Sequence, residues 1–116
     1  MSKLIHRQFT HQCAKTPDNI ALRSDSENIT YRQLELRANN IAQSLIRSGI
    51  TSGDVVGIYM NRCNNLVATI LGILKSGACY LPLDPYYPSD RLAYMAEHSE
   101  AKLVITDNLN LSLIHI

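Results

Sequence analysis

The stretch from residue 55 to residue 60 constrains the fold more than any other. Val55–Met60 is almost entirely apolar and shows no alternation with polar residues. A strand of this kind is typical of a sheet covered on both faces, as parallel sheets are. An apolar helical stripe at 66–75, an apolar run at 79–81, a helix from Pro88 to about His98 and an apolar run at 102–106 follow. This order predicts two successive βαβ units, and therefore an α/β fold with a parallel sheet flanked by helices.

Local signals mark the helix between the first two of these strands. Its stripe consists of Leu66, Ile70, Ile73 and Leu74. Asn64 or Asn65 is expected to cap its start, and Gly77 to end it in the left-handed conformation. A short buried strand is expected next. Three prolines then prevent regular pairing and predict an extended corner, at Pro82, Pro85 and Pro88.

The first fifty residues predict a helix, a hairpin and a longer helix. The first helix covers Leu4–Lys15, and the hairpin pairs residues 20–22 with residues 29–31. Thr30 and Gln33 have the spacing of a capping box, which predicts the start of the long helix. Gly49 predicts its end. Its core-facing seam is expected to contain Leu34, Ala38, Ile41 and Leu45, widened by Ala42 and Ile46, while Arg32, Arg37, Asn39 and Gln43 cover the other face.

Length and composition exclude several classes of function. A chain of 116 residues predicts one domain, and a net charge of +1 gives no electrostatic reason to expect nucleic acid or an anionic membrane as a partner. No apolar run approaches the roughly twenty residues that span a bilayer, and no signal-peptide pattern follows Met1. We therefore expect a cytoplasmic protein. The three cysteines, Cys13, Cys63 and Cys79, lack the spacing of a zinc site or a disulfide framework and are expected to be reduced thiols.

Two segments carry a resemblance to a known family. The continuous segment LKSGACYLPLDPYYPSDRL, residues 74–92, resembles the second core motif of the adenylation domains of nonribosomal peptide synthetases. The segment ITYRQLELRANNIAQSLIRSGITSGDVVGI, residues 29–58, resembles the first core motif and the strand after it. Together the resemblance covers roughly residues 4–107. It implies the start of the large N-terminal domain of an enzyme in the adenylate-forming (AMP-dependent synthetase and ligase) superfamily.

The resemblance also implies a reaction. In the parent enzyme an amino acid would attack the α-phosphate of ATP, with Mg²⁺, to give an aminoacyl-adenylate and pyrophosphate. The acyl group would then pass to a phosphopantetheine thiol on a carrier domain. The partners implied are thus the remainder of the adenylation domain and a carrier domain. Two alternatives stay open: part of an acyl-CoA ligase of the same superfamily, or a non-catalytic small α/β domain that binds or docks to a partner.

The residues that would perform this chemistry are not found in the sequence. Neither G-x-x-x-x-G-K-[ST] nor G-x-G-x-x-G is present, and the family's phosphate loop and catalytic lysine would lie beyond Ile116. We therefore expect no catalytic, cofactor-binding or metal-binding residue in this chain, and no activity from it alone. None of the histidines is assigned to a metal: His6, His11, His98 and His115.

Residues within the second motif have a structural and a functional interpretation. Lys75 is expected to be a solvated lysine at a helix end rather than a phosphate ligand. Asp84 is expected to accept turn amides and Asp90 to lie in a helix's first turn, rather than to bind metal, with Arg91 able to pair with either. A tyrosine cluster is expected to pack around the proline corner rather than to line a pocket: Tyr80, Tyr86, Tyr87 and Tyr94.

The last nine residues differ in character from the rest. Residues 108–116 alternate briefly and then end on an apolar residue, and they do not resemble the family's continuation. We expect the family domain to cover residues 1–107 as a truncated N-terminal portion, with residues 108–116 as a possible sequencing or annotation artefact.

Overall fold

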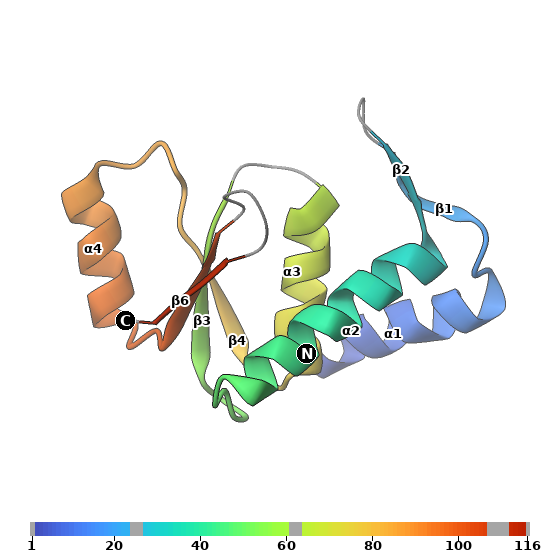
Figure 1. Cartoon of the computed structure of the whole chain (residues 1–116), viewed down its shortest axis with the longest axis horizontal. Helices are drawn as coiled ribbons and strands as arrows, with labels where there is room; N and C mark the ends of the chain where they lie inside the picture. The colour runs from blue at the N-terminus through green and yellow to red at the C-terminus, as the bar shows by residue number, and fades with distance from the viewer. Residues whose placement is uncertain (1, 24–26, 61–63, 107–111, 116) are drawn as a thin grey trace.

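The computed structural model describes residues 2–23, 27–60, 64–106 and 112–115. Figure 1 shows a sheet with helices on either side and a separate hairpin. The elements in chain order are α1 (Ser2–Lys15), β1 (Ile20–Arg23), β2 (Asn28–Thr30), α2 (Tyr31–Arg47), β3 (Val55–Tyr59), α3 (Asn64–Lys75), β4 (Cys79–Pro82), α4 (Ser89–His98), β5 (Leu103–Thr106) and β6 (Ser112–His115).

The main sheet has the strand order β4-β3-β5-β6. β3 is parallel to both neighbours, with Val56 opposite Tyr80 on β4 and opposite Leu103 on β5. β6, which lies in the stretch predicted to differ from the family, pairs antiparallel with β5. The chain therefore leaves β3 toward one side, through α3 to β4, and returns through α4 to β5 on the other side. In Figure 1, α2 and α3 lie on one side of the sheet and α4 on the other. The predicted α/β fold with parallel βαβ units is confirmed.

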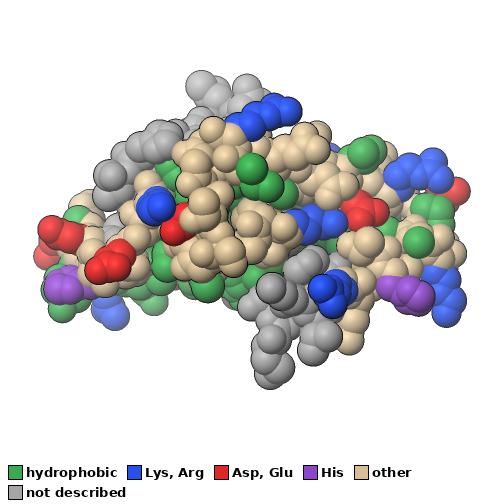
Figure 2. Space-filling model, turned by 90° about the horizontal axis from the view of Figure 1, so that it is seen from below, with side chains coloured by type: hydrophobic (Ala, Val, Ile, Leu, Met, Phe, Trp, Pro, Cys, Tyr) green, Lys and Arg blue, Asp and Glu red, His purple; other side chains and the backbone are tan. Residues whose placement is uncertain are grey.

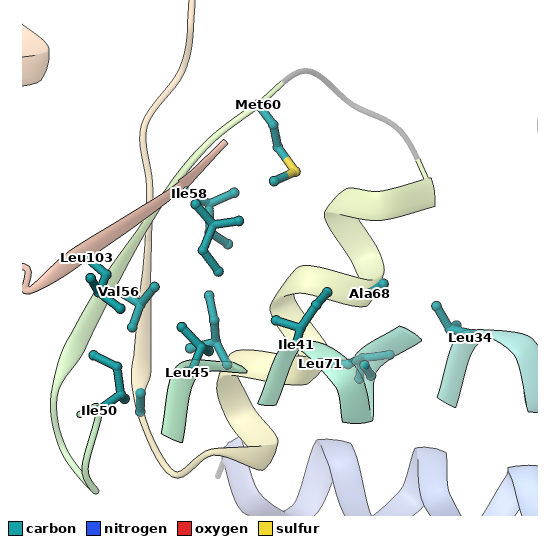
Figure 3. Close-up of a cluster of buried hydrophobic side chains, with 14 of the residues drawn as sticks. Leu34, Ile41, Leu45, Ile50, Val56, Ile58, Met60, Ala68, Leu71 and Leu103 are labelled. Atoms are coloured by element: carbon teal, nitrogen blue, oxygen red, sulfur yellow. The ribbon is translucent and has the colours of Figure 1, made fainter. Parts of the chain in front are cut away.

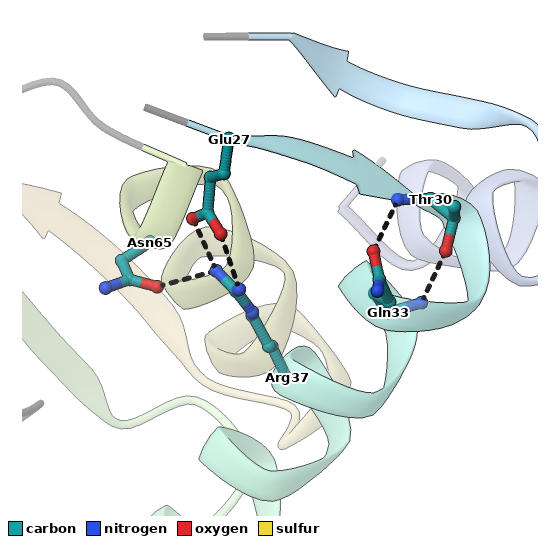
Figure 4. Close-up of polar contacts among 5 residues, drawn as sticks. All are labelled: Glu27, Thr30, Gln33, Arg37 and Asn65. Atoms are coloured by element: carbon teal, nitrogen blue, oxygen red, sulfur yellow. Dashed lines mark hydrogen bonds and ion pairs between the residues drawn. The ribbon is translucent and has the colours of Figure 1, made fainter. Parts of the chain in front are cut away.

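The hairpin and the long helix share one residue as their boundary. β1 and β2 pair antiparallel, with Ile20 opposite Thr30. Thr30 Oγ1 accepts a hydrogen bond from the Gln33 N–H, and Gln33 Oε1 accepts one from the Thr30 N–H, so the predicted capping box is present (Figure 4). Tyr31 was predicted to belong to the hairpin, but it is the first residue of α2, because the cap ends the strand where the helix begins.

The core lies between α2, α3 and the sheet (Figure 3). The buried residues drawn from these elements include Leu34, Ala38, Ile41 and Leu45 of α2, Ala68, Leu71 and Ile73 of α3, Val56 and Ile58 of β3, and Leu103 and Ile105 of β5. The two helices approach closely at Gly72. A Cβ on this residue would lie 2.7 Å from Ile41 Cβ and 2.9 Å from the Ala38 carbonyl oxygen.

The structure corrects three predictions about burial. Of the two residues predicted to widen the seam of α2, Ala42 is buried, but Ile46, one residue before the end of the helix, is 56% exposed. The β4 residues Cys79 and Tyr80 are exposed rather than buried, because β4 is the outermost strand of the sheet. β3 is buried on both faces in its centre only, since Tyr59 at its end is 38% exposed.

The helix ends largely follow the sequence signals. Gly49 and Gly77 have φ angles of 94° and 86°, the left-handed conformation predicted for residues that end helices. Asn65 lies inside α3, and its side-chain oxygen accepts a hydrogen bond from Arg37. The position before Asn64, where a cap of α3 would lie, is outside the described residues.

Candidate functional site

The corner that follows β4 is a hydrogen-bonded turn. The Leu83 N–H donates to the Ile58 carbonyl at 2.8 Å, which continues the pairing of β4 with β3 by one step. Asp84 Oδ1 accepts a hydrogen bond from the Tyr86 N–H at 2.9 Å, and the Asp84 carbonyl accepts one from the Tyr87 N–H at 3.0 Å. Asp84 thus accepts turn amides, as predicted, from the backbone of Tyr86 and Tyr87.

An open hollow of about 800 Å³ lies at the carboxyl ends of β3 and β4. It therefore lies beyond the carboxyl ends of two neighbouring parallel strands, the edge at which open α/β sheets commonly bind ligands. Among its described lining residues only Asp84 carries a charge. The lining consists of Ile58, Met60, Leu66, Leu81, Pro82, Leu83, Asp84, Pro85, Tyr86, Tyr87 and Met95. Such a lining suits an apolar or aromatic group and offers no cation to a phosphate.

The four tyrosines of the second motif occupy different environments. Tyr86 and Tyr87 line the hollow, which is the interpretation that the sequence disfavoured. Tyr94 lies on α4, with its ring centroid 3.9 Å from that of His98, and Tyr80 lies on the exposed strand β4. The four side chains are 37–89% exposed, so a packed aromatic cluster does not form. The prediction failed because β4 and α4 carry Tyr80 and Tyr94 away from the corner.

Charged residues next to the hollow make local contacts. The Arg91 guanidinium lies 4.8 Å from the centre of the Tyr87 ring, a cation–π distance. Asp90 lies in the first turn of α4, as predicted. Within the described chain no ion pair joins Arg91 to Asp84 or Asp90. On the face shown in Figure 2, acidic and basic side chains are interspersed rather than gathered by sign.

Lys75 is not the solvated residue that the sequence predicted. Its side chain is only 13% exposed, and its Nζ lies 3.3 Å from Glu35 Oε1 of α2. The same Nζ donates a hydrogen bond to Thr10 Oγ1 of α1, also at 3.3 Å. The end of α3 packs against two other helices, so the lysine is enclosed together with a carboxylate. Its charge is already engaged, which argues against a role in binding phosphate.

A second polar cluster, which consists of Arg37, Glu27 and Asn65, was not predicted from the sequence. Arg37 was expected to cover the solvated face of α2, but its guanidinium makes two hydrogen bonds, of 3.2 and 3.1 Å, to the Glu27 carboxylate (Figure 4). It also donates to Asn65 Oδ1 at 3.3 Å. This cluster ties the hairpin to α2 and α3. The partners lie 10 and 28 residues away in sequence, so no local pattern could have revealed it.

Other candidate groups do not assemble into a reactive site. Within residues 2–23, 27–60, 64–106 and 112–115, no three His, Cys, Asp or Glu side chains lie close enough to share a metal ion. Cys13 is a buried free thiol and Cys79 an exposed one, while Cys63 lies outside the described residues. None of the helices described is long and apolar enough to cross a membrane.

A parallel sheet with helices on both faces and an apolar hollow at the carboxyl ends of two strands is typical of α/β enzymes that bind ligands at that edge of the sheet. Comparison with known proteins makes the assignment specific. The chain belongs to the AMP-binding enzyme family, whose model matches residues 9–115. It is 44% identical over 105 residues to bacitracin synthase 1 of Bacillus licheniformis and 40% identical over 107 residues to gramicidin S synthase 2 of Aneurinibacillus migulanus. These matches cover 90% and 92% of this chain but only 2% of each of those proteins.

Solved structures agree with this assignment. The nonribosomal peptide synthetase FmoA3, in its form bound to α-methyl-L-serine-AMP, matches 91% of this chain with a TM-score of 0.88 and 33% identity. The N-terminal subdomain of Klebsiella oxytoca NpsA matches 91% with a TM-score of 0.82 and 26% identity. The matched parts are 12% and 28% of those chains. The recognised motifs thus belong to the family that they resemble.

Proposed function

We propose that this chain is the N-terminal scaffold of an amino-acid-activating adenylation enzyme of nonribosomal peptide synthesis. The observation that carries this proposal is the match to FmoA3, a synthetase whose structure contains an aminoacyl-adenylate. The relatives named above are also peptide synthetases or synthases, which favours this branch over acyl-CoA ligases. A non-catalytic docking domain is the less favoured alternative, because the sheet and both motifs match parts of enzymes.

The proposed parent reaction has two steps. A carboxylate oxygen of the amino acid attacks the α-phosphorus of Mg²⁺-bound ATP, a P–O bond to the leaving pyrophosphate breaks, and an aminoacyl-adenylate forms. The phosphopantetheine thiol of a carrier domain then displaces AMP to give a thioester. A fused adenylation–carrier (PCP) di-domain of NpsA is among the similar structures, which supports the carrier domain as partner.

In this proposal the chain supplies framework rather than reacting groups. Such a reaction needs donors that cradle phosphate and cations that neutralise developing charge. The described residues offer neither at the hollow, where Asp84 would repel an anion, and Lys75 is paired with Glu35. We therefore infer that ATP and Mg²⁺ contact other parts of the parent enzyme, and that the chain alone does not activate amino acids. The domain boundary at residue 107 stays a prediction.

A chimera tests the proposal. Residues 1–107 would replace the matching segment of FmoA3, and ATP–pyrophosphate exchange would be measured with α-methyl-L-serine. Exchange should persist, because the groups that react come from FmoA3. The matched control is the same chimera with Gly72→Val, which should lose exchange, because a larger side chain cannot fit against Ile41. A folded chimera without exchange would contradict the proposal, and exchange by the 116-residue chain alone would contradict its role as scaffold.

A further inference from the structure

Residues 7–15 of the first helix make few apolar contacts with the rest of the fold. Among the described α1 side chains, residues 7–15, Phe9 is half-buried against the core and Cys13 is 3% exposed. The Phe9 ring lies 6.1 Å from that of Tyr31 on α2. The remaining side chains of this segment are polar, apart from the exposed Ala14. Residues 7–15 therefore contribute one fully buried side chain to the core, whereas α2 and α3 each contribute several.

One polar group compensates for this weak attachment. Lys75, at the end of α3, reaches both Thr10 of α1 and Glu35 of α2 at 3.3 Å. We call Lys75, Glu35 and Thr10 the Lys75 cluster. The side chains of Lys75 and Glu35 are 13% and 25% exposed, so their attraction is less screened than that of a surface pair. Charge-assisted hydrogen bonds are also stronger than neutral ones. The Lys75 cluster is thus a charged link between the described part of α1 and the helices α2 and α3.

Cys13 lies at the same junction and reports whether α1 is in place. Its Sγ donates a weak hydrogen bond to the Tyr31 carbonyl at 3.4 Å. Burial, followed by the Glu35 carboxylate, raises the pKa of the Cys13 thiol to about 11. The thiolate is the reactive form of cysteine, so Cys13 is unreactive while α1 is docked. Cys79, on the exposed strand β4, has no such cover.

We propose that α1 detaches reversibly from α2 and α3 as a unit, that the Lys75 cluster sets how often it does so, and that Cys13 reacts only in the detached form. The remaining core stays assembled, because the contacts of α2, α3 and the sheet with one another do not pass through α1. Proteins open locally in such cooperative units, and segments with few buried apolar contacts open at a low cost in free energy. No local sequence pattern indicates the contact between α1 and α3, because Lys75 lies 65 residues from Thr10.

Peptide-resolved alkylation of the full chain tests the proposal. The chain would be treated with iodoacetamide at pH 8, and labelling of Cys13 and Cys79 would be followed separately by mass spectrometry. In the parent chain Cys13 should react at least tenfold more slowly than Cys79. Thr10→Val removes only the contact with α1, and Lys75→Met removes the cluster. Each should raise the Cys13 rate, by about threefold and about tenfold respectively, and leave the Cys79 rate unchanged.

A matched variant separates local opening from global unfolding. Ile105→Val removes one methylene group from the core at β5, far from α1 in sequence, and should lower the urea midpoint without changing the Cys13 rate. A Cys13 rate that rises as much in Ile105→Val as in Lys75→Met would overturn the proposal, because exposure would then require global unfolding. The proposal would also be overturned if Cys13 reacted as fast as Cys79 in the parent chain. It would be overturned as well if Thr10→Val and Lys75→Met both left the Cys13 labelling rate unchanged.

Discussion

Replacing Gly72 by Ala tests how closely α2 and α3 pack. In an exposed helix the change would be favourable, because Ala is preferred to Gly by about 1 kcal/mol. Here the new Cβ would lie 2.7 Å from both Cβ and Cγ2 of Ile41 and 2.9 Å from the Ala38 carbonyl oxygen. These atoms are on or next to the backbone of α2, so a change of rotamer cannot relieve the overlap. The two helices must move apart, which opens the core between them.

The cost of overpacking and the gain in helix preference together give the expected change in the free energy of unfolding. Overpacking of a core costs about 1–3 kcal/mol, and the position of the contacting atoms places this site toward the upper end of that range. Subtracting the helix preference of about 1 kcal/mol leaves a net loss of about 1–2 kcal/mol in the free energy of unfolding. With an m-value of about 1–2 kcal/mol per molar urea, the midpoint should fall by roughly 1 M.

Urea unfolding followed by circular dichroism measures this change. Asn39→Ala, on the exposed face of α2, is the matched control and should leave the midpoint unchanged or raise it, because Ala is the better helix former. Gly72→Val should lower the midpoint further than Gly72→Ala, since its two Cγ atoms extend the overlap. A midpoint for Gly72→Ala at or above that of the parent chain would refute the close packing of the two helices.

Three further changes have defined outcomes. Thr30→Ala should reduce the free energy of unfolding by about 1 kcal/mol, because the Gln33 N–H loses its acceptor; urea titration would show this, and an unchanged midpoint would speak against the capping box. Stability should fall as the pH rises from 9.0 to about 11, because the Cys13 thiol ionises first in the unfolded chain; Cys13→Ala should remove that part of the slope, and an identical slope would disprove the link. The unpaired backbone groups of the outer strand β4 should let two chains associate through this edge; Tyr80→Lys should reduce that association in sedimentation velocity, and equal association would exclude this edge as the contact.

Sequence patterns correctly predicted the features that depend on residues close together in the sequence. The apolar run at Val55–Met60 and the capping box at Thr30 are contiguous signals, so the parallel strands and the start of α2 could be read from them. The Leu34–Leu45 seam was also predicted, because helical periodicity places its members on one face whatever they contact. The same information is contained in the two family motifs, which explains why the fold and the family assignment were both confirmed.

The predictions that were wrong concern contacts between distant parts of the chain. Lys75 has the same helix-end position whether it is solvated or paired, and its partner Glu35 is 40 residues away. Whether Cys79 is buried depends on which strand becomes the edge of the sheet, and the strand pattern alone does not decide this. The hollow joins side chains of β3, α3, the proline corner and α4, so its shape follows from tertiary packing. Local propensity contains none of this information.

The strand order also has a consequence for synthesis on the ribosome. β3 gains its first neighbour when β4 emerges, but its second, β5, follows about twenty residues later, which at 5–20 residues per second is roughly one to four seconds. During this interval one side of β3 has free N–H and carbonyl groups and can pair with a foreign strand. One side of β3 in the nascent chain therefore stays open to misassembly until residues 103–106 have been made, and slow translation of the α4 segment would lengthen that period.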